Sequence, residues 1–247
     1  MTGPESEAGD RDAFLEASFW HGGLDQARKI LTAHPEIAAS DIYVAATLGD
    51  DATVKRFLAG NASLATKPGG PRNVDALTHL CFSRFLAYDA SRSEGFVRAA
   101  TALLDAGADP NGGFFDAAHS PEPTRESVLY AAAGVAHHAG VTRLLLDRGA
   151  DPNDGEVPYH SPESFDNAAM QVLLESGRMN AQSLSMMLLR KTDWHDLDGV
   201  RLVLDGGAEV NRMTRWGKTA LHNALLSDNR LEIVELLLDR GADPTIV

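Results

Sequence analysis

The residues of this 247-residue sequence that could perform chemistry are mainly its nine histidines and the carboxylates near them. His137 and His138 are adjacent, so they cannot point from one face of a helix toward a shared metal ion. The segment Asp193–Asp196 places two carboxylates around an imidazole, a combination that could bind a metal ion or transfer a proton. A solvated loop covered by Trp194 is the simpler interpretation of this segment, and we favour it.

The sequence contains no familiar catalytic motif. It lacks a Gly-x-Ser-x-Gly nucleophile elbow, a phosphate-binding Gly-rich loop and a His-Glu-x-x-His helix. Cys81 is the single cysteine, and its neighbours Leu80 and Phe82 predict a buried, unreactive side chain. We therefore assign no catalytic residue, no cofactor site and no metal site. The pair Tyr159 and His160 has the same standing as the segment Asp193–Asp196. If the protein has an active site, we expect it in the stretch from Glu156 to Gly177, which contains this pair.

The charge balance of the chain narrows the range of partners. The formal net charge is −13 at pH 7, which argues against general nucleic-acid binding, because phosphates are neutralised by a surplus of Lys and Arg. The chain begins with small, polar and acidic residues that do not resemble a signal peptide, and we interpret residues 1–11 as a flexible tail. No apolar run approaches the roughly 18 residues of a membrane span. These features predict a cytoplasmic protein that binds neither nucleic acid nor membranes.

A short sequence motif, which we call the repeat phrase, occurs several times along the chain. Residues 103–111 read Leu-Leu-Asp-Ala-Gly-Ala-Asp-Pro-Asn, and similar phrases occupy residues 145–153, 203–211 and 237–244, with a weaker copy at residues 173–177. The glycines of these phrases are 42, 28, 30 and 34 positions apart. This spacing indicates an internal repeat of about 33 residues, with insertions and deletions in its loops.

The phrase is typical of the end of a helix. Leucines lie on the buried face, and the glycine that follows can adopt a left-handed conformation without a steric penalty. In the second repeat Asn61 takes the place of this glycine, and we expect it to form the same left-handed cap. Upstream of the last phrase, Thr219 is a good N-cap for a second helix. On that helix Leu221, Ala224 and Leu225 recur at i, i+3 and i+4, which predicts a face packed on the neighbouring repeat.

The same frame begins at Ser40 and at Ser127. In this frame the chain resembles the ankyrin-repeat family, whose inner helix typically begins Thr-Pro-Leu-His-Leu-Ala-Ala, and the stretch 80–86 is similar to a bacterial branch of that family. The resemblance implies an all-α solenoid of about seven helix–turn–helix repeats over residues 12–247. The histidine of the family motif is matched only at His222, where the resemblance implies a structural role that links neighbouring repeats.

The repeats are not regular throughout. We expect them to start near Asp12, Ser40, Asp75, Ser127, Glu156, Ser183 and Thr219. In the fifth repeat, Pro158 and Pro162 fall where the inner helix should run, so that helix must be short or broken. Insertions are expected at residues 86–95, 112–124 and 192–196. Such insertions project from one face of a repeat protein, and this is often the binding face.

The resemblance implies a function as a protein-interaction module that binds a partner protein on its concave face. The frame places on this face Phe19, Thr47, Leu48, Ser83 and Lys191, and the candidate partner-binding residues are Trp20, Arg72, Phe82, Arg84, Phe114, Phe115, Tyr159, His160, Arg190, Arg215, Trp216 and Lys218. Aromatic and arginine side chains dominate binding energy at interfaces. Basic residues gathered on one face of an acidic chain suggest a partner with an acidic or mixed patch.

A second hypothesis is an enzyme or small-molecule-binding protein. It would use a pocket at the interrupted fifth repeat, overhung by the loop that carries Phe114 and Phe115. An enclosed pocket lined by Tyr159, His160 and Phe115 would favour this hypothesis, whereas an open groove would favour the interaction module. Because no catalytic motif is present, the interaction module is the preferred interpretation.

Overall fold

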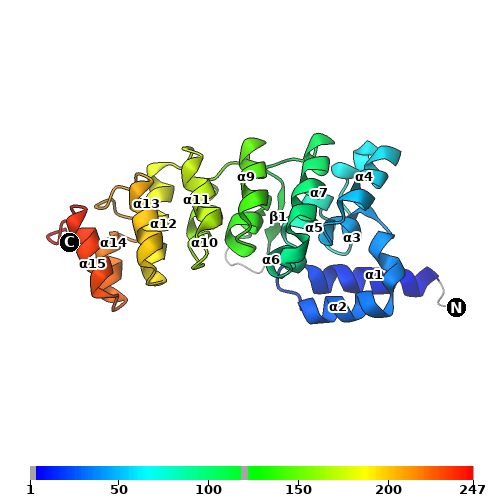
Figure 1. Cartoon of the computed structure of the whole chain (residues 1–247), viewed down its shortest axis with the longest axis horizontal. Helices are drawn as coiled ribbons and strands as arrows, with labels where there is room; N and C mark the ends of the chain where they lie inside the picture. Colours follow the sequence, from blue (N-terminus) through cyan, green and yellow to red (C-terminus); the bar gives the residue numbers. More distant parts are fainter. Residues whose placement is uncertain (1–3, 118–121, 247) are drawn as a thin grey trace. The chain divides into compact units, whose positions relative to one another are not determined.

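The computed structural model describes residues 4–117 and 122–246, with the side chains of residues 4–7 left out. The chain divides into two compact units, Met1–Ala150 and Asp151–Val247, and each is described by itself. Both units consist mainly of short helices joined in pairs by tight loops (Figure 1). The expected all-α architecture is confirmed, with one small exception in the first unit. The number of repeats stays a prediction.

In the first unit, helices pair within a repeat and stack on the equivalent helices of the next repeat. Contacts join α1 to α2, α3 to α4, α5 to α7 and α8 to α9, and stacking contacts join α3 to α5, α4 to α7 and α7 to α9. The α-helices are α1 (Pro4–Ser18), α2 (Leu24–Ala33), α3 (Ile42–Thr47), α4 (Asp51–Gly60), α5 (Ala76–Cys81), α6 (Arg84–Tyr88), α7 (Ser93–Asp105), α8 (Val128–Tyr130) and α9 (Ala139–Asp147). Short 3-10 turns cover Pro35–Ala39, Ala62–Ala65 and Ala90–Arg92, and a π-helical turn covers Ala131–Val135. Helix α1 begins at Pro4, so residues 4–11, which we expected in the tail, are helical.

The second unit repeats this arrangement. Helix α12 packs against α10 and α14 on its two sides and against its own partner α13, and α15 packs on α13 and α14. The helices are α10 (Glu156–His160), α11 (Ala168–Glu175), α12 (Ala181–Asp193), α13 (Leu197–Asp205), α14 (Ala220–Leu226) and α15 (Leu231–Asp239). Helix α10 has five residues and contains Pro158, and Pro162 lies just beyond it, which confirms the broken inner helix of the fifth repeat.

The helix ends confirm most of the local predictions. Thr219 and Ser127 accept N-capping hydrogen bonds from backbone amides as expected. The repeat glycines adopt left-handed conformations, with φ of +100° at Gly107 and +96° at Gly207. The prediction for Asn61 was wrong: its φ is −158°, and its side chain instead caps the following 3-10 turn by accepting from the Ser63 amide. The same hydrogen-bonding capacity that lets Asn tolerate a left-handed cap here serves a new turn.

A two-stranded hairpin is the exception to the all-α fold among the described residues. Strand β1 (Gly113–Asp116) lies in the connector expected at residues 112–124 and pairs antiparallel with β2 (Thr124–Ser127), which begins at the end of that connector. Residues 118–121 of that connector lie outside the described residues. Gly113 has φ of +150°, and a Cβ there would lie 2.1 Å from the carbonyl oxygen of Glu126, so only glycine allows the strands to approach.

Small side chains allow close stacking of the inner helices. Ala45 and Ala46 in α3, and Ala131–Ala133 after α8, are fully buried. Cys81 is buried as predicted, and its burial raises the pKa of the thiol. None of the described helices is both long and apolar enough to cross a membrane.

Single asparagines join consecutive repeats at the loops. The Asn211 side chain donates to the carbonyl oxygen of Gly241 at 2.9 Å and accepts from the amide of Asp243 at 2.8 Å. Asn153 makes the equivalent pair of bonds with the Arg178 carbonyl, at 3.0 Å, and the Asn180 amide, at 2.8 Å. Each of these asparagines therefore satisfies one acceptor and one donor of the next repeat's backbone.

Candidate functional site

The second unit gathers several candidate residues into one group, which we call the aromatic–ionic cluster: Tyr159, His160, Glu163, Arg190 and Trp216. Tyr159 and His160 end the short helix α10, Arg190 lies in the last turn of α12, and Trp216 lies in the turn before α14. The ring centroids of Tyr159 and Trp216 are 5.9 Å apart in an edge-to-face arrangement. The structure therefore brings the predicted pair Tyr159 and His160 together with Arg190 and Trp216, two candidate residues from other parts of the sequence.

Arg190 is held in this cluster from several sides. Its guanidinium carbon lies 4.3 Å from the centroid of the Tyr159 ring, a cation–π distance. It forms ion pairs with Glu163 and Asp193, and its Nε donates to the Tyr159 carbonyl oxygen at 3.4 Å. With both carboxylates engaged, Arg190 orients Tyr159 and leaves little of its own charge for a partner.

His160 is a charged residue of the cluster. Its Nδ1 lies 2.8 Å from a Glu163 oxygen and its Nε2 lies 3.2 Å from a Glu156 oxygen. Burial alone would lower the pKa of His160, but the hydrogen bonds to both glutamates outweigh it and raise the pKa to about 9. Burial likewise opposes ionisation of Glu163, yet His160 and Arg190 keep the pKa of Glu163 below its ordinary value. At neutral pH both imidazole nitrogens thus donate to carboxylates, and His160 is an ion-paired residue of the cluster.

Lys191 was expected on the exposed face, and this prediction was wrong. Its side chain has 0% exposure, and its Nζ donates to Asp196 at 2.8 Å and to the Ser164 carbonyl oxygen. Asp196 also accepts from the Gly199 amide at 3.0 Å and from Asn167 at 2.9 Å. Burial lowers the pKa of Lys191, whereas these bonds outweigh burial and lower the pKa of Asp196. The pair ties the loop that replaces the missing helical turns of the fifth repeat to the sixth repeat.

The turn before α14 presents the most accessible part of the site. Thr214 donates to the Lys218 carbonyl oxygen and Gly217 donates to the Thr214 carbonyl oxygen, both at 2.9 Å, which closes the turn. Trp216 is 45% exposed, and the Arg215 guanidinium lies 4.9 Å from its ring. Within the described part of the chain, Arg215 and Lys218 form no ion pair. Two uncompensated cations thus flank an exposed indole.

A small pocket lies beside this turn. It has a volume of about 140 Å³ and is lined by Asn153, Gly155, Pro158, Asn180, Gln182, Ser183, Met186 and Arg215. Pockets for small ligands are usually about 300–1,000 Å³. Tyr159 and His160 do not line it, and Phe115 lies in the other unit. The pocket at the fifth repeat is therefore too small to favour the enzyme or small-molecule hypothesis.

The candidate residues of the first unit form a second group, which is mainly core. Phe82 is 1% exposed and stacks on Phe19 at 5.3 Å between centroids, so placing Phe82 on an exposed face was wrong. Trp20 and Phe114 pack on Phe82 at 5.5 and 5.1 Å. Phe115 points to the other side of the hairpin and is 68% exposed. Successive side chains of a β-strand point to opposite faces, so Phe114 and Phe115 of β1 are separated, although we expected both to act together in one loop.

The arginines of the first unit are already engaged. Arg72 is exposed but pairs with Glu16 at 2.8 Å and lies 4.8 Å from the Phe19 ring. Arg84 donates to the Trp20 carbonyl oxygen at 3.1 Å, with its guanidinium 4.5 Å from the ring of Tyr88. The other positions expected on the exposed face and found buried are Phe19, Thr47, Leu48 and Ser83.

A serine–histidine pair in the first unit does not form a catalytic dyad. Ser93 Oγ lies 2.7 Å from His138 Nε2, and the Val141 amide donates to His138 Nδ1 at 3.1 Å. Because Nδ1 accepts, the neutral ring carries its proton on Nε2 and donates to Ser93. Burial lowers the pKa of His138, which keeps the ring neutral. His138 is therefore the N-cap of α9.

The segment Asp193–Asp196 is likewise structural. Asp193 pairs with Arg190 and accepts from Asn223 at 2.7 Å, and Asp196 pairs with Lys191. Trp194 packs edge-to-face on Phe165, as a covered loop requires. His222 forms a capping box with Thr219 of its own helix, which is a structural role within one repeat.

Sequence reasoning missed Glu156 and Glu163 as members of the site. Together with His160 they lie at i, i+4 and i+7, a spacing that places all three on one side of a helical turn. This spacing was the available signal, but the two prolines directed attention to the break in the helix.

Comparison with known proteins agrees with the fold. The family model of ankyrin repeats (three copies) matches residues 185–247. The ankyrin-repeat domain of human ASB11 superposes with a TM-score of 0.60 at 22% identity, covering 83% of this chain and 85% of that one. The ankyrin-repeat domain of Bcl-3 gives a TM-score of 0.62 at 19% identity, covering 83% and 87%. The fold is thus the ankyrin-repeat fold.

Two curated proteins share part of the sequence. An L-asparaginase of Dirofilaria immitis is 28% identical over 183 residues, which are 68% of this chain and 28% of that protein. A 2-5A-dependent ribonuclease of Homo sapiens is 43% identical over 72 residues, which are 29% of this chain and 10% of that protein. The chain therefore spans less than a third of the length of either relative.

Proposed function

We propose that the protein is an interaction module that binds a partner protein through the aromatic–ionic cluster and the adjoining turn of Arg215 and Lys218. Ankyrin-repeat proteins generally mediate protein–protein interaction, and this supports the general assignment. The observation that carries the specific site is the exposed Trp216 between two unpaired cations. Such a surface matches a partner segment with a carboxylate beside an apolar side chain.

The rigidity of the cluster supports this assignment. An interface gains affinity when its anchors are ordered before binding, because less conformational entropy is lost. Tyr159 is fixed by Arg190, and the rings of Tyr159 and Trp216 pack in an edge-to-face arrangement. The cluster therefore orders the Trp216 side chain before a partner binds. The charges of Arg215 and Lys218 then favour a partner with acidic residues at this surface.

Site-specific photo-crosslinking tests the proposal. A photoreactive phenylalanine analogue replaces Trp216 in one variant and Leu231, at the exposed start of α15, in the control. We expect Trp216-dependent crosslinks to one protein, with the crosslinked partner peptide containing Asp or Glu. Equal crosslinking from both positions, or a crosslinked peptide without acidic residues, would contradict the assigned site.

A further inference from the structure

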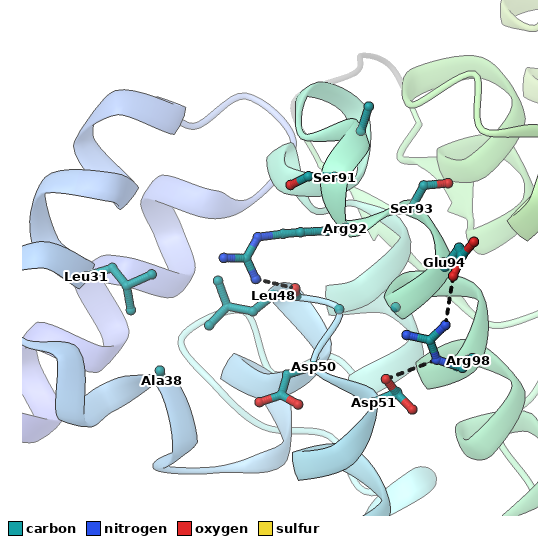
Figure 2. Close-up of a pocket in the computed structure, with 13 residues that line it drawn as sticks. Leu31, Ala38, Leu48, Asp50, Asp51, Ser91, Arg92, Ser93, Glu94 and Arg98 are labelled. Carbon is teal, nitrogen blue, oxygen red and sulfur yellow. Dashed lines mark hydrogen bonds and ion pairs between the residues drawn. The ribbon is translucent and has the colours of Figure 1, made fainter.

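The first unit contains a cavity that the proposed interaction surface does not use. Its volume is about 580 Å³, within the range of small-ligand pockets. One wall is the 3-10 turn Ala90–Arg92 and the start of α7, which belong to the insertion at residues 86–95. The opposite wall is the loop between α3 and α4, with Leu31 and Ala38 from the first repeat beside it (Figure 2). The cavity therefore exists because the insertion adds a wall that a regular repeat lacks.

Arg92 is fixed in one wall with part of its guanidinium left over. Its Nε donates to Asp89 at 3.1 Å and its Nη1 donates to the Leu48 carbonyl oxygen at 3.0 Å (Figure 2). Its guanidinium carbon also lies 5.5 Å from the Phe85 ring. Among the described residues, none bonds to Nη2. The guanidinium is thus oriented by the fold and retains donors for an anionic group.

Asp50 supplies the opposite charge. Its Oδ1 accepts from the Thr53 amide at 3.1 Å and so caps α4. Its Oδ2 has no bonding partner within the part of the chain that the structure describes. Figure 2 shows the carboxylate of Asp50 on the other side of Leu48 from the Arg92 guanidinium. An acceptor and a donor thus face the cavity with an apolar side chain between them.

The other charges around the cavity compensate one another. Asp51 pairs with Lys55 at 2.7 Å and with Arg98 at 3.2 Å, and Arg98 also bonds Glu94 at 3.3 Å. Arg92 itself pairs with Asp89 at 3.1 Å through Nε, so Asp50 is the carboxylate of this group that has no ion pair among the described residues, and Arg92 offers its remaining N–H donors. A simple anion would be attracted by Arg92 but repelled by Asp50. A simple cation would be attracted by Asp50 but repelled by Arg92.

We propose that this cavity binds a short zwitterionic ligand, an amino acid or a peptide of two or three residues, with its carboxylate on Arg92 and its ammonium group on Asp50. Leu31, Ala38 and Leu48 contact the carbon atoms between the two charges. Charge-assisted hydrogen bonds at both ends select a ligand that carries both groups at the right separation. This binding site is distinct from the aromatic–ionic cluster, which lies in the other unit.

Isothermal titration calorimetry of the full chain with probes of increasing charge separation tests the proposal. The probes are glycine, β-alanine, γ-aminobutyrate, ε-aminocaproate and triglycine, with acetate and methylammonium as single-charge controls. We expect saturable binding that passes through an optimum with length, and no binding of the controls. An optimum at glycine identifies a free amino acid, and an optimum at triglycine or ε-aminocaproate identifies a peptide.

Two substitutions then assign the ends. Asp50→Asn keeps the capping oxygen but removes the charge, and it should weaken binding of the best probe at least about tenfold. Asp75→Asn makes the same change at the N-cap of α5, outside the cavity, and should leave binding unchanged. Arg92→Gln should abolish binding. Saturable binding of acetate alone, no binding of any probe, or equal binding by wild type and Asp50→Asn would overturn the proposal.

Discussion

Lys191 and Asp196 form a buried ion pair in which the ammonium group also donates to the Ser164 carbonyl oxygen. Lys191 lies in α12 and Asp196 is the N-cap of α13, so the pair joins these two helices to the loop that carries Ser164. A Cβ at Gly199 would lie 2.5 Å from Lys191 Cε, so this position has to be glycine for the pair to fit. Ser164 follows Glu163 in the same loop, so the pair fixes the loop from which Glu163 reaches Arg190. In this way the buried pair helps to position the aromatic–ionic cluster.

The buried pair should be important for stability. Lys191→Met leaves Asp196 charged in a buried site, and we expect the free energy of unfolding to fall by about 3–5 kcal/mol. Urea unfolding monitored by circular dichroism measures the loss. Adding Asp196→Asn, which keeps the cap of α13, should recover part of it. Lys55→Met removes an exposed partner of Asp51 and should cost less than about 1 kcal/mol. Equal losses for the two lysines would contradict the structure.

His160 should make stability depend on pH. Its folded pKa, about 9, exceeds the unfolded value of about 6.5. A raised pKa means that its contribution is complete below pH 6.5 and is lost as pH rises through 9. The difference in unfolding free energy between wild type and His160→Gln should therefore shrink from pH 6 to pH 9.5, as measured by urea unfolding at several pH values. A difference that stays constant over this range would be inconsistent with an imidazolium held by Glu156 and Glu163.

The packing of the last repeat gives a third prediction. Leu221 in α14 is buried, and α14 packs on α12. Leu221→Ala should leave a cavity and cost about 2–5 kcal/mol. Because repeats interact mainly with their neighbours, protection from hydrogen exchange should fall at Leu236 and remain at Ile42. Equal loss at both positions would show that the chain unfolds as one cooperative body.

Affinity for a protein partner should depend on the exposed turn. Once the crosslinked partner is known, Arg215→Ala combined with Trp216→Ala should raise Kd about thirtyfold, which corresponds to about 2 kcal/mol. Calorimetry or fluorescence anisotropy measures the change. Glu235→Ala, an exposed charge on α15, is the control and should have no effect. An unchanged Kd in the double variant, with its circular dichroism intact, would place the binding site elsewhere.

Features set by local chemistry could be predicted from the sequence. Gly107 and Gly207 end their helices as expected because no other residue adopts their backbone conformation as cheaply. Thr219 caps its helix because its side chain reaches an amide three residues away. The broken fifth repeat followed directly from the chemistry of proline. Each of these predictions required only neighbouring residues.

Features set by packing could not be predicted in the same way. Lys191 follows Arg190 on α12, and the periodicity does not reveal which of the two turns inward. Lys191 turns inward because Asp196 and the Ser164 carbonyl oxygen bond its ammonium group. The sequence does not indicate that the loop around Ser164 lies next to Lys191. Phe82 was misplaced for the same reason, since Phe19 and Phe114 cover it from distant parts of the chain. The sequence indicated which residue types could bind a partner, but it did not show that Lys191 and Phe82 are buried in the core.

The asparagine joints have a consequence for how such a chain can change. Asn153 and Asn211 recognise backbone atoms of the following repeat, and every amino acid except proline presents the same amide and carbonyl groups. A neighbouring repeat can therefore be duplicated, deleted or exchanged for one with a different surface while the joint keeps both of its bonds. The bonds that join the repeats do not depend on the side chains of the following repeat. The exposed side chains of that repeat can therefore change without loss of the joint.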